Sequence, residues 1–183
     1  LKKNEQIPGE KFTVGEHIKV FVTEVMKESI RGPLVNLSRT APGLVKRLFE
    51  LEIPEIHDGV VVIMSITREA GSRTKMAVMS RDPNVDPIGA CIGNKGMRIQ
   101  PIITELRGEK IDIVKYSEDP AEYISAALSP AEVKEVIIDS ERSCRVVVAA
   151  DQLSLAIGKE GQNARLAARL TGFKIDIKTK AAL

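Results

Sequence analysis

The chain has 183 residues, of which 43% are apolar, and its formal net charge is +2. This length can bury a real core and suits one ordinary domain or two to three small ones. The nearly balanced charge excludes a polycation, and no run of about 18 apolar residues exists that could form a membrane-spanning helix.

The N-terminus and the cysteines indicate the compartment. Residues 1–5 are too polar for a signal peptide. Cys91 and Cys144 lack the spacing of a zinc site, so we expect two small buried thiols in a reducing compartment. The sequence therefore predicts a cytoplasmic protein without membrane contact. Leu1 stands where an initiator Met is expected, which favours a piece of a longer protein.

Residues 1–38 have the pattern of β-strands. Ile18, Val20 and Val22 alternate with other residues, a turn-prone segment follows at 27–33, and strand-like residues resume at 34–37. Two or three strands do not make a stable sheet alone. We therefore expect this sheet to be unfinished.

From residue 40 the apolar period becomes helical. Pro42 suits a first helical turn, and Pro54 ends the run. The elements expected next are strands at 60–66 and 75–79 around a turn at 70–72, a helix capped by Asp86 that runs to Ile92, a break at 93–96, a helix that ends at Gly108, and a strand at 110–115.

The remaining residues repeat this order. The expected elements are a helix from Asp119 closed by Ser129-Pro130, strands at 133–138 and 145–149, a helix capped by Asp151 that runs to Ile157, a break at 158–161, a helix at 162–171 and a strand at 173–178. The sequence predicts an α+β fold class, with two units of about 65 residues each.

An internal repeat supports this division. The motif Ile-Gly-x-x-Gly occurs twice, and Gly93 and Gly158 are 65 residues apart. About one Gly-x-x-Gly is expected here by chance from average glycine usage. However, the flanking residues also align, down to the tetrapeptide Lys-Ile-Asp-Ile that begins at Lys110 and again at Lys174. A match of this length indicates a true repeat.

The chemistry of the motif suits a phosphate. Two glycines let a ligand approach the backbone, and the following helix offers free N–H groups at its positive end. Glu160 follows Gly158-Lys159 where a nucleotide P-loop needs Ser or Thr, and Cys91 stands where a dinucleotide fingerprint needs Gly. No catalytic constellation is signalled by spacing, so we expect no enzyme, no cofactor, no metal site and no small-molecule substrate.

Cations gather on the repeated motif although the whole chain is nearly neutral. They are Lys95, Arg98, Arg107 and Lys110 in the first copy, and Lys159, Arg165, Arg169 and Lys174 in the second. Such segregation is expected of an anion-binding surface. Ordinary solvated helix faces would give the same pattern at any single position, and this alternative stays open.

A break of the form Ile-Gly-x-x-Gly between two short helices is typical of the KH module, whose loop clamps about four nucleotides of a single strand. Ile92 and Ile157 are candidates for the wall of an aliphatic base groove, and packing in the core is an equally good reading of both. The chain has no Trp and is 3% aromatic, which disfavours aromatic stacking platforms.

Several longer strings carry a closer resemblance. They are Leu-Ser-Arg-Thr at 37–40, Leu-Glu-Ile-Pro-Glu-Ile at 51–56, Arg-Glu-Ala-Gly-Ser-Arg-Thr-Lys at 68–75, Asp-Pro-Ile-Gly-Ala-Cys-Ile-Gly at 86–93 and Gln-Leu-Ser-Leu-Ala-Ile-Gly at 152–158. With these strings, essentially the whole chain resembles the NusA family of bacterial transcription elongation factors.

The resemblance implies an architecture. Residues 1–38 would be the C-terminal part of an OB-type barrel of the ribosomal S-one class. Residues 39–116 and 117–183 would be two tandem type II (prokaryotic) KH domains.

The resemblance also implies a function. The protein would bind nascent single-stranded RNA and modulate pausing, termination and antitermination by RNA polymerase. The polymerase-binding N-terminal domain of the family has no counterpart in these residues, so contacts with polymerase and other transcription factors would need the full-length protein.

The predicted RNA-binding residues lie in and around the two loops. They are Ile92, Gly93, Asn94, Lys95, Gly96, Arg98, Ile157, Gly158, Lys159, Glu160, Gly161, Gln162, Asn163, Arg165 and Arg169, with Arg68, Arg73, Lys75 and Arg145 as weaker candidates for base contacts. The carboxylate of Glu160 would repel a nearby phosphate, so we expect the first loop to be the stronger clamp.

Two other functions remain open at this point. KH units whose loops have lost RNA binding could serve as a scaffold for protein contacts in the transcription complex, and Glu160 favours this reading. A ribosome-assembly protein that binds structured RNA is a further alternative, since KH folds serve there too.

Overall fold

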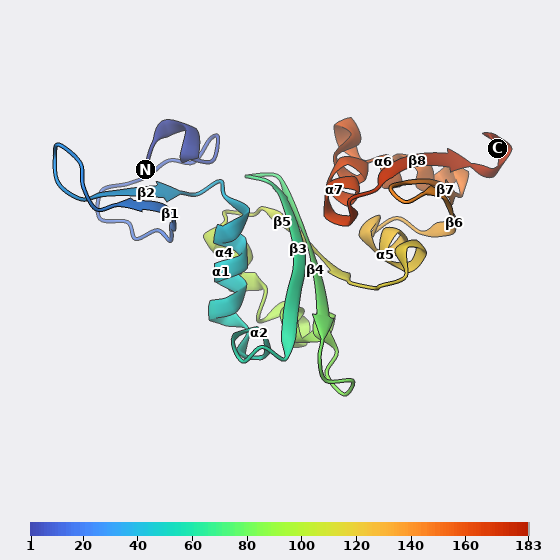
Figure 1. Ribbon diagram of the computed structural model, residues 1–183, viewed down its shortest axis with the longest axis horizontal. Coiled ribbons are helices and arrows are strands. Elements are labelled where there is room, and N and C mark those ends of the chain that lie inside the picture. The colour runs from blue at the N-terminus through green and yellow to red at the C-terminus, as the bar shows by residue number, and fades with distance from the viewer. Residues whose placement is uncertain (183) are drawn as a thin grey trace.

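The computed structural model describes residues 1–182, which form an N-terminal β-ribbon followed by two α+β domains (Figure 1). The ribbon pairs β1 (Phe21–Met26) with β2 (Leu34–Ser38) in antiparallel fashion. The turn and second strand agree with the prediction, but the first strand begins at Phe21 rather than Ile18. Val22, Val25, Leu34 and Val35 are exposed on this ribbon.

The first domain occupies the middle of Figure 1. Its elements are α1 (Pro42–Glu52), α2 (Pro54–His57), β3 (Val61–Glu69), β4 (Arg73–Ser80), α3 (Pro87–Ile92), α4 (Gln100–Glu105) and β5 (Lys110–Lys115). The sheet order is β3-β4-β5, with β3 and β4 antiparallel and β4 and β5 parallel. Phe49, Met76 and Ile102 lie in the core between the helices and one sheet face.

The second domain repeats this plan. Its elements are α5 (Pro120–Ala127), β6 (Val133–Ser140), β7 (Ser143–Val148), α6 (Leu153–Ile157), α7 (Gln162–Thr171) and β8 (Lys174–Thr179). The sheet order β6-β7-β8 again combines an antiparallel pair with a parallel pair. The predicted repeat of the two α+β units is therefore confirmed in three dimensions.

The predicted N-caps are correct for α3 and α5 and wrong for α6. Asp86 and Asp119 cap α3 and α5, accepting hydrogen bonds from the N–H groups of Ile88 and Ala121. The prediction that Asp151 caps α6 is wrong. Asp151 lies inside a 3₁₀ turn, and α6 starts from Gln152 without a side-chain cap.

The two domains share a core. Ala77 of β4 and Val114 of β5 pack into the same buried cluster as Ile124, Leu128 and other apolar residues of the second domain. Helix α7 lies along β3, where Ser65 Oγ donates to the carbonyl of Leu170 at 3.1 Å. The two domains are therefore held face to face by apolar and polar contacts. No helix within residues 1–182 combines the length and apolar character that crossing a membrane requires.

Candidate nucleic-acid interface

The two glycine loops have the same backbone conformation. Gly93 and Gly158 adopt φ values of 76° and 78°, with ψ values of 172° and 170°. The third residue of each loop, Lys95 or Glu160, is left-handed although it is not glycine, with φ of 51° and 55°. The two loops therefore share one backbone conformation although their two middle residues differ.

The first glycine of each loop is required by packing as well as by φ. A Cβ on Gly93 would lie 2.7 Å from Cγ of Arg98, and one on Gly158 would lie 2.7 Å from the backbone N of Asn163. The last glycines, Gly96 and Gly161, have positive φ but open space, because the nearest atom to an added Cβ is 3.9 Å away. The open side of each loop is thus the side a ligand can approach.

The loops offer free donors. Among the described residues, the N–H groups of Asn94 and Lys95 in the first loop, and of Lys159 and Glu160 in the second, donate to no protein acceptor. All four residues are exposed. An exposed turn with unused N–H groups is suited to an anion such as phosphate.

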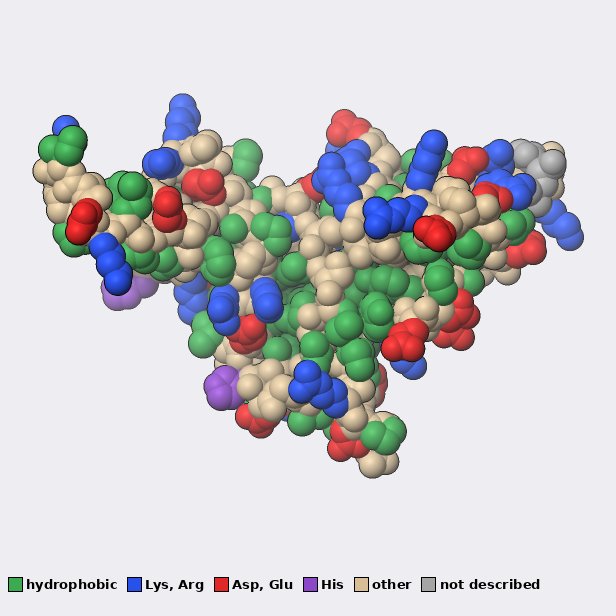
Figure 2. Space-filling view, viewed as in Figure 1, with side chains coloured by type: hydrophobic (Ala, Val, Ile, Leu, Met, Phe, Trp, Pro, Cys, Tyr) green, Lys and Arg blue, Asp and Glu red, His purple; other side chains and the backbone are tan. Residues whose placement is uncertain are grey.

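Lysines supply charge beside these donors. Lys95 and Lys159 are exposed, as is Arg169, and none of the three pairs with a carboxylate in the part of the chain that the structure describes. Figure 2 shows Lys and Arg side chains gathered over α6, α7 and β8. These cations remain available to a phosphate backbone.

Arg98 has a local partner. Its Nη1 donates to Glu55 Oε2 at 2.8 Å and to the carbonyl of Ala90 at 2.9 Å. The pKa of Glu55 is lowered, first by a hydrogen bond from its own backbone and also by Arg98. Arg98 thus braces the end of α3, immediately before the first loop.

Arg165 and Gln162 contact the other domain. Arg165 Nε donates to Glu69 Oε1 at 2.6 Å, and Gln162 Nε2 donates to Glu69 Oε2 at 2.8 Å. The hydrogen bond from Arg165 holds the pKa of Glu69 below its usual value. Both predicted RNA-binding residues therefore have a role in joining the domains.

Asn163 has a structural role. It is fully buried, and its Nδ2 donates to the carbonyls of Leu128 and Ala156 at 3.0 and 2.9 Å. A side chain buried in this way does not reach RNA. Its prediction as an RNA contact is corrected, because the amide instead ties the start of α7 to α5 and α6.

The weaker candidates on the first sheet are also corrected. Arg68 is buried against Glu109, and Lys75 is buried with its Nζ 3.0 Å from Asp112 Oδ2 and 2.7 Å from the carbonyl of Ser129. Burial lowers the pKa of Lys75. Lys75 faces protein because the second domain covers that face of the sheet. Arg68 faces Glu109 and the carbonyls of Arg39 and Ala41 within the first domain.

Arg73 and Arg145 are engaged in ion pairs too. Arg73 Nε lies 3.2 Å from Asp112 Oδ2, and Arg145 binds both carboxylate oxygens of Asp139. The hydrogen bond to Asp139 raises the pKa of Arg145. Each guanidinium therefore has an acidic partner, although Arg73 Nε makes no hydrogen bond within residues 1–182.

The predicted groove isoleucines lie outside the buried clusters. Ile157 is 38% exposed, beside Leu155 at 44%, whereas Ile92 is half-buried. Cys91, next to Ile92, is buried as predicted, and burial raises the pKa of its thiol to about 12. Cys144 is also buried as predicted. The loops are thus flanked by apolar side chains rather than by a reactive thiol.

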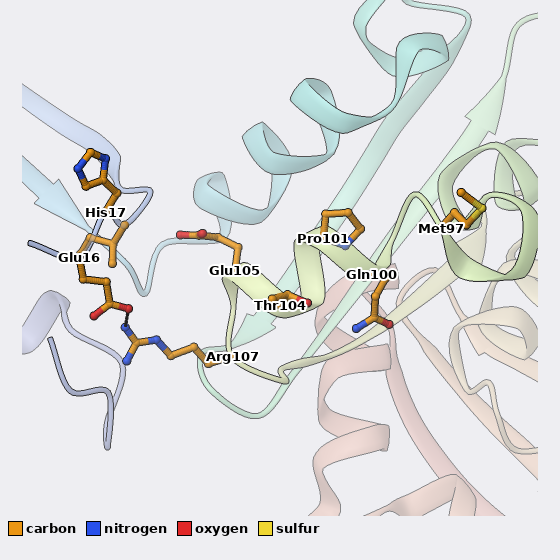
Figure 3. Close-up of a pocket in the computed structure, with 9 residues that line it drawn as sticks. Glu16, His17, Met97, Gln100, Pro101, Thr104, Glu105 and Arg107 are labelled. Atoms are coloured by element: carbon orange, nitrogen blue, oxygen red, sulfur yellow. Dashed lines mark hydrogen bonds and ion pairs between the residues drawn. The ribbon is translucent and has the colours of Figure 1, made fainter. Parts of the chain in front are cut away.

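A cleft of about 600 Å³, which the sequence did not indicate, lies between the N-terminal segment and α4 (Figure 3). Its lining runs from Met97, just after the first loop, to His17. Arg107 borders it, and its Nη2 donates to Glu16 Oε1 at 3.0 Å. Arg107 therefore holds the N-terminal segment against the first domain, although the charge pattern assigned it to the anion-binding surface.

Arg39 is a further residue whose role the sequence did not reveal. It is fully buried, and its guanidinium binds Glu10 at 2.6 Å and Glu105 Oε1 at 3.0 Å. Burial opposes its charge, but the hydrogen bond to Glu10 contributes most to raising its pKa. This ion pair fixes the segment before the first domain onto α4, next to the loop-bearing helices.

Comparisons with known proteins agree with this geometry. Residues 39–116 match the NusA-like first KH domain, and residues 120–183 match the NusA-like second KH domain. The crystal structure of APE1850 shares the fold, with a TM-score of 0.53 and 24% identity over 73% of this chain and 96% of that chain.

Similarity to individual proteins extends over nearly the whole chain. The transcription termination/antitermination protein NusA of Bacillus subtilis is 55% identical over 98% of this chain and 48% of the relative. The NusA proteins of Mycobacterium bovis and Thermus thermophilus are 54% and 52% identical over 97% and 96% of this chain, and over 51% and 45% of those relatives. The chain thus spans about half the length of these curated relatives. The two α+β units are NusA-like KH domains, and the chain belongs to the NusA family.

Proposed function

We propose that the chain is the RNA-binding part of a transcription elongation factor. It binds nascent single-stranded RNA, and through the full-length protein it contacts RNA polymerase and modulates pausing, termination and antitermination. The observation that supports RNA binding best is the pair of exposed loops with identical backbone geometry, unused N–H groups and a free lysine each. Membership of the NusA family supports the role in transcription.

We also propose the division of the chain into parts. Residues 1–38 are the end of an OB-type barrel, and the KH domains occupy 39–116 and 117–183. The exposed apolar residues of the two-stranded ribbon support the first assignment, because the face of a closed barrel would cover them.

The proposed binding is non-catalytic and has two parts. Loop N–H groups, Lys95 and Lys159 hold phosphates, while Ile92 and Ile157 lie where bases would pack. Since each KH loop clamps about four nucleotides, two loops on joined domains suit a strand of about eight. Four to six neutralised phosphates would give a slope of log affinity against log salt of about −3 to −4.

A charge-matched pair of variants tests this proposal. Lys95→Asp places an acid in the first loop, and aspartate tolerates the left-handed backbone found there. Lys46→Asp makes the same charge change on the exposed side of α1. Binding of a single-stranded RNA of about ten nucleotides should weaken at least tenfold in the first variant and less than threefold in the second.

The scaffold function is favoured by one specific observation, since Glu160 is exposed within the second loop. If Lys95→Asp and Lys159→Asp both fold and both bind single-stranded RNA as the parent does, the loops are not the RNA site and the scaffold function replaces ours. A preference for duplex over single-stranded RNA would instead favour a ribosome-assembly function.

A further inference from the structure

We propose that the second glycine loop, Gly158–Gly161, is held in its binding shape by the first domain, and that Glu69 is the positioning residue. Glu69 is the last residue of β3, on the far side of the domain junction from the loop. The consequence for RNA rests on the proposed function, whereas the consequence for loop order can be measured without RNA.

The guanidinium of Arg165 connects Glu69 to the loop. Both carboxylate oxygens of Glu69 accept from Arg165, at 2.6 Å from Nε and 3.1 Å from Nη2. The remaining nitrogen, Nη1, donates to the backbone carbonyl of Glu160 at 3.0 Å. One guanidinium therefore binds the first domain and the loop at the same time, which its planar fork permits.

The carbonyl that Arg165 binds belongs to the strained residue of the loop. Glu160 has φ of 55°, and a left-handed non-glycine residue costs roughly 1–2 kcal/mol. A hydrogen bond to this carbonyl favours the strained conformation over relaxed ones. Arg165 therefore acts on the peptide that defines the loop shape.

Gln162 adds a second connection at the same place. It is the first residue of α7, immediately after the loop, and its Nε2 donates to Glu69 and to Ser72 Oγ at 2.7 Å. Glu69 thus receives hydrogen bonds from residues two and five positions after Glu160. The start of α7 and the loop are fixed to the same carboxylate.

The first loop has no such dependence. Its brace is Arg98, which binds Glu55 and Ala90 within the same domain. At the repeat position of Arg98 the second domain has Asn163, whose Nδ2 donates to the carbonyls of Leu128 and Ala156 within that domain. Both loops are therefore supported from within their domains, and among the described residues the second loop is in addition connected, through Arg165, to Glu69 of the first domain.

The variant Glu69→Gln tests the inference, and Glu55→Gln is the matched control. Each replaces one carboxylate by an amide of the same shape. In the RNA-free protein, exchange of the hydrogen-bonded amides of Gly161 and Gln162 should accelerate about tenfold in Glu69→Gln, since hydrogen bonds to charged groups are the strong ones. Exchange of the corresponding amides of Gly96 and Met97 should stay as in the parent, and Glu55→Gln should leave those of Gly161 and Gln162 unchanged.

The direction in which RNA affinity changes in Glu69→Gln separates a positioning role from direct binding of RNA by Arg165. Glu69→Gln removes a negative charge and frees Arg165. If Arg165 were simply a phosphate ligand, RNA affinity would rise. Positioning predicts a fall of about threefold or more, because the loop loses its shape. Arg165→Lys should accelerate exchange of the Gly161 and Gln162 amides as well, since one ammonium cannot replace the forked contact.

The outcomes are distinguishable from failure of the proposed function. Unchanged exchange of the Gly161 and Gln162 amides in Glu69→Gln overturns the inference, and so does a rise in RNA affinity. If exchange accelerates but neither parent nor variant binds RNA, the positioning of the loop stands and the proposed function fails.

Discussion

Replacing Arg68 by Met should strongly lower the free energy of unfolding of the first domain. It should have no direct effect on contacts with RNA. Arg68 and Glu109 have no exposed side-chain surface, and Arg68 donates to both Glu109 oxygens from Nε at 3.1 and 3.0 Å. Removing one partner of a buried pair leaves an uncompensated charge, which costs about 3–5 kcal/mol. The carbonyls of Arg39 and Ala41 also lose the donor Nη1.

The double variant Arg68→Met/Glu109→Gln separates the charge from the shape. The N–H of Gly71 donates to Glu109 Oε1 at 2.7 Å and the hydroxyl of Thr74 donates to Oε2 at 2.8 Å. A neutral amide at position 109 can keep its oxygen toward the N–H of Gly71, and its NH2 group can donate to the Thr74 hydroxyl, which also accepts. We expect the double variant to regain at least about 2 kcal/mol, since only the charge imbalance is removed. Urea unfolding followed by far-UV circular dichroism measures both values. A loss below about 1 kcal/mol in the single variant would refute the reasoning.

Three further outcomes follow from the loops. Gly93→Ala should cost more stability in thermal unfolding than Gly96→Ala, because both have positive φ but only Gly93 meets Arg98; equal costs would contradict this. Because the pKa of Glu69 is lowered in the folded state, its contribution is present above the ordinary value of 4.5 and is lost as pH falls through the folded pKa. Protection of the second loop, corrected for intrinsic exchange, should therefore be flat from about pH 5 to 8 and fall in acid, but not in Glu69→Gln. Glu160→Gln should raise RNA affinity about two- to threefold if a phosphate lies at that loop, and no change in a filter-binding titration would place the RNA elsewhere.

Local signals predicted the elements that carry the loops. The strand at Lys110–Lys115 and the helix at Gln162–Thr171 have the predicted bounds, because each is enclosed by glycines or by a change of period. Asp86 and Asp119 are caps because Pro follows each of them and fixes the first helical φ. Asp151 is followed by Gln152 instead, and a 3₁₀ turn forms before the helix.

The roles of the cationic side chains could not be predicted from the neighbouring sequence. Arg68 and Lys75 bind partners 41 and 37 positions away, and Lys75 also binds a carbonyl 54 positions away in the second domain. In an isolated domain, the face of β4 that bears Lys75 would be exposed. It is buried only because the second domain packs on it, which no pattern within the first domain indicates.

The two loops of the repeat have the same backbone conformation but are held in it by different residues. Lys95 and Glu160 adopt the same left-handed conformation, yet Arg98 braces one loop within its domain and Arg165 braces the other across the junction. A loop shape that is supported from the neighbouring domain is lost when the domains separate, whereas an internally braced loop is not. Because the domains also share a buried core, their docking and the geometry of the second loop form one cooperative unit. The binding strength of each loop therefore depends on the residues that hold it in shape as well as on its own sequence.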